Sequence, residues 1–159
     1  MRWSIAAIAV ISFAFPISPA SAGGPPFKNS DFKGDYALVL NGSDASCAGA
    51  PCPISITGQI DANGNGKITS GSISLNESGI GCTLVLSSST YSFSKDGTGT
   101  ITLTAGTDDI ECATGESPLT TLGLTATLFD SGDQAVLASA TTSPDKVVVA
   151  GTAASQNKL

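Results

Sequence analysis

The sequence predicts an all-β domain, an antiparallel up-and-down barrel of about eight to nine short strands, with a β-sandwich as the alternative. Apolar and polar residues alternate with a period of two in one short segment after another, as in half-buried strands. Asn-Gly and Asp-Gly signals separate these segments, and they supply the positive φ that tight hairpin turns need. No segment has the period of an amphipathic helix.

The chain begins with the pattern of a secretory signal peptide, residues 1–22. Arg2 provides the positive start, residues 5–15 are mostly apolar, and Ala20-Ser21-Ala22 offers the small residues that signal peptidase requires. Because the apolar run is too short to span a bilayer, cleavage after Ala22 is expected instead of a retained anchor. We therefore expect an exported protein, secreted or periplasmic, without membrane attachment after cleavage.

Three further regions follow the predicted signal peptide. Residues 23–31 contain Pro25-Pro26 and are expected to form a flexible lead-in. The β domain is predicted over 32–153, and a frayed tail over 154–159.

Nine segments inside the predicted domain carry the strand pattern. They are 35–40, 54–60, 68–75, 82–87, 91–94, 100–105, 122–128, 134–141 and 147–152. In the third segment the apolar phase shifts by one residue between Ile68 and Ile73, which predicts a β-bulge at Gly71. Residues 106–118 are predicted to be the longest loop.

Hairpin follows hairpin with short turns, which favours an up-and-down meander. A meander of this many strands protects its edges best by closing into a barrel. The positions that face outward are mainly Ser and Thr, so a transmembrane barrel is excluded.

Four cysteines, Cys47, Cys52, Cys82 and Cys112, indicate disulfides in an exported chain. Cys47 and Cys52 flank a short loop that can close on itself, which favours Cys47–Cys52 and Cys82–Cys112 among the three possible pairings. A zinc site has little support, since the chain has no His and no pair of Cys-x-x-Cys elements.

The composition excludes one class of partner. The chain has 13 Asp and Glu against 7 Lys and Arg, and its only Arg lies in the predicted signal peptide. Nucleic acids and anionic membranes are bound through Lys and Arg, so neither is an expected partner.

The opening of the domain resembles a known family. Phe32-Lys33-Gly34-Asp35-Tyr36, followed by a Leu-x-Leu-x-Gly pattern, is similar to the start of lipocalin-like, or calycin-like, barrels. The later segments look like a set of uncharacterised exported bacterial β-barrel proteins, in the hairpin 58–68, the strand start 90–92 and the segment 96–103. The resemblance implies a lipocalin-like barrel. Lipocalins have Gly-x-Trp where this chain has Gly34-Asp35-Tyr36, and their Trp and a conserved Arg close the barrel base.

Asp61, Asn63 and Asn65 match the first half of a calcium loop, where oxygen ligands stand at alternate positions. The twelfth position, which should hold a bidentate Glu, is Ser72. Because Asn and Gly are also what a hairpin turn requires, the same residues predict a plain turn. Asp108, Asp109 and Glu111 form an acidic cluster that is either a cation site or a solvated loop.

Three aromatic residues are candidates for ligand binding: Tyr36, Tyr91 and Phe93, whose phase predicts that they face inward. They would either line a pocket for a small apolar molecule or fill the core.

No catalytic constellation is present. A Ser nucleophile has no His as its base, and Glu77, Glu111 and Glu116 are not spaced as a catalytic pair. The leading prediction is a non-enzymatic exported barrel, without a cofactor, that binds a small apolar or uncharged ligand. The alternative is a secreted structural or surface-interaction domain with a solid core, and a carboxylate-dependent hydrolase ranks third.

Overall fold

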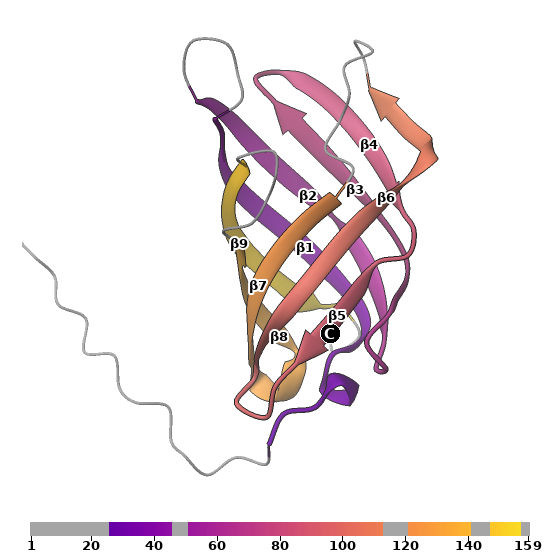
Figure 1. Cartoon of the computed structure of the whole chain (residues 1–159), viewed down its shortest axis with the longest axis vertical. Helices are drawn as coiled ribbons and strands as arrows, with labels where there is room; N and C mark the ends of the chain where they lie inside the picture. Colours follow the sequence, from indigo (N-terminus) through magenta and orange to yellow (C-terminus); the bar gives the residue numbers. More distant parts are fainter. Residues whose placement is uncertain (1–25, 46–50, 113–120, 141–146, 157–159) are drawn as a thin grey trace, which may run out of the picture.

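The computed structural model describes residues 26–45, 51–112, 121–140 and 147–156 (Figure 1). The predicted signal peptide and Cys47 lie outside these residues. The described strands are β1 (Lys33–Asp44), β2 (Cys52–Asn63), β3 (Ile68–Glu77), β4 (Ile80–Leu86), β5 (Thr90–Phe93), β6 (Thr98–Cys112), β7 (Thr121–Phe129), β8 (Gln134–Ser139) and β9 (Val147–Ser155). Two 3-10 turns, η1 (Asn29–Asp31) and η2 (Asp130–Gly132), accompany them.

The strands form one antiparallel sheet in the order β4-β3-β2-β1-β9-β8-β7-β6-β5. Because β4 also pairs with β6, the hydrogen-bonded pairs β1-β2-β3-β4-β6-β7-β8-β9 return to their starting point and make a closed ring (Figure 1). The all-β, antiparallel prediction is therefore confirmed. Closure leaves the strands of the ring with a neighbour on each side, which protects their edges from pairing with other chains.

β4 and β5 share a single strand position in this ring, next to β6. Both pair with β6, β5 along its first half and β4 along its second half. The segment between them breaks the strand at Ser88, which has a φ of 51°. β5 also faces the start of β3, because the Ile68 amide donates to the Ser89 carbonyl at 3.0 Å. The two short strands thus act as one strand with a bend.

The predicted β-bulge occurs in β3, but not at Gly71. Asp61 and Ala62 on β2 pair with Ser70 and Ile68, so Thr69 is the extra residue. Its Oγ1 donates to Asp61 Oδ2 at 2.8 Å, which holds the bulged residue against the neighbouring strand. Gly71 itself is regularly paired with Ile60.

Two predicted irregular segments are partly strand. The long loop predicted over 106–118 is wrong as far as Cys112, because β6 continues to that residue. The frayed tail is wrong for Ala154 and Ser155, because β9 runs to Ser155 and pairs with β1 on one side and β8 on the other. Two paired neighbours satisfy the backbone of a sequence that carries little apolar pattern of its own.

The segment expected as a flexible lead-in makes defined contacts from Phe27 onward. The Phe27 amide donates to the Lys95 carbonyl at 3.0 Å, and the Phe93 amide donates to Asn29 Oδ1 at 2.8 Å. Phe27 packs against the core. The segment is thus tied to the β5–β6 hairpin at one end of the ring.

The interior of the ring is filled with side chains. Twelve large side chains expose less than 2% of their surface: Tyr36, Phe32, Leu38, Leu40, Ile56, Ile60, Leu84, Ile101, Leu103, Leu122, Leu124 and Leu137. A void large enough for water would give the side chains around it accessible surface of their own, so none adjoins these residues. The inward Gly58 leaves no space either, since a Cβ there would lie 2.3 Å from the Ser72 carbonyl oxygen.

Candidate functional site

The three aromatic residues predicted to bind a ligand lie together at one end of the ring. With Phe32 they form a cluster, here called the aromatic cap: Phe32, Tyr36, Tyr91 and Phe93. Phe32 is its centre, because its ring stacks on Tyr36 at a centroid distance of 4.1 Å and meets Tyr91 edge-on at 5.0 Å. Phe93 lies 5.3 Å from Phe32 and 5.8 Å from Tyr91. Such distances and tilts are those of favourable aromatic pairs.

Both hydroxyl groups of the aromatic cap already have partners. Tyr36 Oη donates to the Gly132 carbonyl at 2.7 Å, and Tyr91 Oη donates to the Phe32 carbonyl at 2.7 Å. Burial raises the pKa of Tyr36 to about 12 and also raises the pKa of Tyr91. The cap is therefore a satisfied, neutral plug that joins β1, β5 and η2, and it offers no free polar group to a ligand.

The aromatic cap predicts a loss of stability in alkali. A raised pKa in the folded state means that stability is complete below pH 10 and is lost as the pH rises toward about 12. Both tyrosines of the chain lie in the cap, so tyrosinate absorbance reports on this cluster alone. We expect tyrosinate to appear together with unfolding, and Tyr36→Phe to weaken this pH dependence. Titration of both tyrosines near pH 10 in a chain that stays folded would contradict this.

The candidate calcium residues form a hairpin turn. Asn63 Oδ1 accepts hydrogen bonds from the amides of Asn65 at 2.7 Å and Lys67 at 3.2 Å. Asp61 Oδ2 accepts from Thr69. Gly64 and Gly66 have φ values of 81° and 88°, the conformation for which the turn needs glycine. Asn63 Oδ1 thus serves the turn, and one carboxylate oxygen of Asp61 serves the contact with β3.

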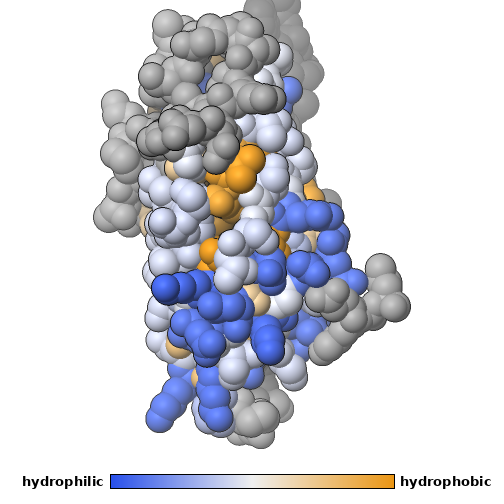
Figure 2. All heavy atoms as spheres, turned by 90° about the vertical axis from the view of Figure 1, so that its right-hand side faces the viewer, coloured by the Kyte–Doolittle hydropathy of each residue, from blue (hydrophilic) through white to orange (hydrophobic). Residues whose placement is uncertain are grey.

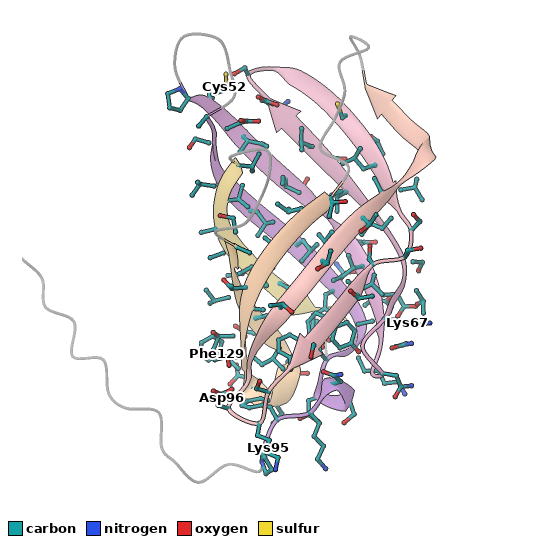
Figure 3. All side chains as sticks on the ribbon, in the orientation of Figure 1. Cys52, Lys67, Lys95, Asp96 and Phe129 are labelled. Carbon is teal, nitrogen blue, oxygen red and sulfur yellow. The ribbon has the colours of Figure 1, made fainter. Side chains whose placement is uncertain are left out.

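The three cysteines of the described strands, Cys52, Cys82 and Cys112, lie at the opposite end of the ring. Cys52 opens β2, as Figure 3 shows at the upper end of the molecule, while Lys95 and Asp96 mark the lower end. Cys82 on β4 pairs directly with Cys112 on β6 in the strand register. Neither Cys52 nor Cys82 is a free thiol. The acidic residues Asp108, Asp109 and Glu111 lie on β6 at this end, and their side chains, like Glu116, are outside the described part.

A shallow hollow lies on the outer rim at the cysteine end. Its volume is about 390 Å³, and its lining is uncharged: Asn41, Gly42, Pro53, Ile54, Ser55, Asn76, Ser78 and Gly79. Asn41, Ser55 and Asn76 stand in one row across β1, β2 and β3, because each pairs with the next in the register. This row could not be predicted from the sequence, because strand pattern shows each residue only as an outward position on its own strand and does not show the register between strands.

Among the described residues, no group of three His, Cys, Asp or Glu side chains could hold a metal ion. None of the helical segments that the structure describes is long and apolar enough to cross a membrane. A scan against protein-family models found no family that matches the chain, and a search of curated proteins found no relative.

Proposed function

We propose that this chain is an exported, non-enzymatic domain that acts through its outer surface and not through a ligand cavity. The packing of the interior carries the proposal, because the inward side chains of the ring are almost completely buried against one another. The aromatic cap adds support, since its rings and hydroxyls are occupied by contacts within the chain. We further propose that the fold is a lipocalin-like barrel without the lipocalin cavity, in which β4 and β5 together form one bent strand.

The outer surface has the composition of a contact surface for uncharged partners. Among the described side chains of β5 and β6, the outward ones are mainly Ser and Thr: Thr90, Ser92, Thr98, Thr100, Thr102 and Thr104. On the side of the molecule that carries β4 and β6, Figure 2 shows weakly polar and hydrophobic residues in the middle and strongly hydrophilic residues in the lower part. Strongly hydrophilic residues thus gather in the lower part of this wall, and its middle can approach another molecule with little loss of hydration.

The proposal is tested by asking whether the folded chain takes up an apolar molecule. We would titrate the protein, purified from its own host, with an uncharged fluorescent naphthylamine probe, and record its native mass spectrum. We expect no saturable probe binding and no bound small molecule. Leu38→Ala titrated with benzene is the positive control, because removing a side chain that is 1% exposed leaves an apolar cavity of the size that benzene can enter. Saturable binding of one probe by the unaltered chain would overturn the proposal.

A second candidate function is the binding of a small uncharged polar molecule at the rim hollow. Its volume lies within the range of ordinary ligand sites, about 300–1,000 Å³, and a row of two amides and one hydroxyl lines it. Under this candidate the native mass spectrum shows a polar molecule that Asn41→Ala and Asn76→Ala release and that Leu38→Ala retains. A bare chain in all of these samples would exclude it.

A further inference from the structure

We propose that the outward face of β8, β9 and β1 is the surface through which two copies of this chain associate. This inference rests on the proposed function and names its partner. The face, here called the aliphatic face, consists of Ala37, Val39, Val136, Ala138, Val148, Ala150, Thr152 and Ala154. The three strands lie side by side in the ring (Figure 1).

Exposed apolar side chains gather on this part of the wall. In the described part of the chain, five large apolar residues are exposed, and four of them lie on the consecutive strands β7, β8, β9 and β1. Val148 is 63% exposed, Val136 51% and Val39 48%. The outward positions of β2 and β3 are instead polar, for example Thr57, Ser72 and Ser74. The fifth exposed residue, Val85, lies on β4. Exposed valines on three neighbouring strands make an apolar outward face, which is unusual for a chain that stays single in water.

The register makes the aliphatic face self-complementary. Thr152 on β9 pairs with Val39 on β1 and with Val136 on β8, so two valines flank one central residue in the same row. A two-fold axis parallel to β9 and between two such faces brings Val39 of one copy against Val136 of the other. The same axis brings Val148 against its own counterpart. This is the arrangement of an isologous interface, in which one patch contacts itself.

The aliphatic face can be covered by a second copy without burying an ionised side chain. The chain carries a net charge of −6, so two copies repel each other. The strands β7, β8 and β9 contain no Asp, Glu, Lys or Arg, and the charged residues of β1 lie at its ends. Association of two like-charged copies has the smallest desolvation penalty where neither copy buries an ionised group.

The area agrees with a weak dimer. Four rows at about 6.8 Å and three strands at about 4.8 Å give roughly 400 Å² per copy. Two copies would bury about 800 Å², which is the size of a weak, transient contact. Small side chains such as Ala150 and Ala154 let the two sheets approach closely. We therefore expect dissociation in the micromolar range and not a permanent dimer.

Sedimentation velocity tests the proposal, with the host-purified protein at concentrations from about 1 µM to about 1 mM. We expect a monomer that converts to a dimer as the concentration rises. Added salt should strengthen the dimer, because it screens the repulsion between like-charged copies. Val136→Lys and Val148→Lys should each remain monomeric, since both place charges inside the contact. Ser72→Lys is the matched control, because it adds the same charge at an exposed position on β3 and should dimerise like the unaltered chain.

Circular dichroism and urea unfolding establish that the Lys variants are folded, which exposed positions should tolerate. A monomer over the whole concentration range would overturn the proposal, as would equal dimerisation of Val136→Lys and Ser72→Lys. Failure here is distinguishable from failure of the proposed function. Uptake of the apolar probe by the unaltered chain contradicts the solid interior, whereas a probe-free monomer contradicts only the aliphatic face.

Discussion

Phe32→Ala is expected to destabilise the chain by about 3–5 kcal/mol. Phe32 is completely buried and stands at the centre of the aromatic cap, where it contacts Tyr36, Tyr91 and Phe93. Truncation removes the transfer free energy of a phenyl ring and leaves a cavity between residues of β1 and β5, whose strands are held by the ring and cannot both move inward. Urea denaturation followed by circular dichroism measures the loss. The tyrosine bands of the near-ultraviolet spectrum should weaken as well, because both rings lose their rigid neighbour.

Two further variants make this prediction sharp. Phe129→Ala removes the same side chain from an outward position that is 46% exposed, and it should cost less than about 1 kcal/mol. Phe32→Leu keeps an apolar side chain of smaller volume and should lie between the two. If Phe32→Ala were no more costly than Phe129→Ala, the aromatic cap would not be a unit of the core.

The strand pattern could be predicted because burial imposes a period of two on each strand of the ring. The inward residues of β6 and β7, such as Ile101, Leu103, Leu122 and Leu124, are the apolar residues of an alternation visible in the sequence. The predictions were wrong where strand pairing, and not the side-chain pattern, determines the structure. The end of β9 has little apolar contrast, yet its backbone is held on both sides. The shift of apolar phase in β3 is visible in the sequence and indicates a bulge. The position of the bulge depends on the contact between Thr69 and Asp61.

The candidate site was predicted only in part. The strand alternation placed Tyr36, Tyr91 and Phe93 inward. A pocket lining and a filled core have the same alternation in sequence, so the two could not be told apart. What distinguishes them is that the Phe32 ring packs against all three side chains. Phe32 follows η1, outside the strand alternation, so its place between three aromatic rings could not be read from periodicity. The lipocalin resemblance implied that the base lacks its Trp and Arg. In this chain Phe32 stacks on Tyr36, and Tyr36 Oη donates to the Gly132 carbonyl.

The pairing of β4 with β6 is the irregular part of the ring, and the predicted Cys82–Cys112 disulfide lies beside it. Leu86 pairs with Ala105, but Leu84 pairs with Ile110, so β6 has extra residues between these points. Directly opposed residues of antiparallel strands are close enough for a disulfide. Cross-linking these positions closes a loop of about 30 residues, which by chain entropy stabilises the fold by about 3–4 kcal/mol.

Tryptic mapping without reduction tests the connectivity. Trypsin cuts after Lys33, Lys67, Lys95 and Lys146, which puts Cys47 and Cys52 in one peptide, Cys82 in the next and Cys112 in the third. Under the predicted pairing, the first peptide appears alone with a mass two hydrogens below that of its reduced form. The second and third peptides appear joined by a disulfide. Either alternative pairing joins all three peptides, which would contradict the prediction.

Removal of the cross-link should open the ring at this pairing. The double variant Cys82→Ala with Cys112→Ala should lose about 3–4 kcal/mol of unfolding free energy, and amide exchange should rise first in β4 and at the end of β6. Removal of Cys47 and Cys52 is the matched control. Its loop of about five residues predicts a loss of only about 2 kcal/mol, without faster exchange in β4. Equal losses, or exchange that rises uniformly, would show that the disulfide does not specifically hold the β4–β6 pair.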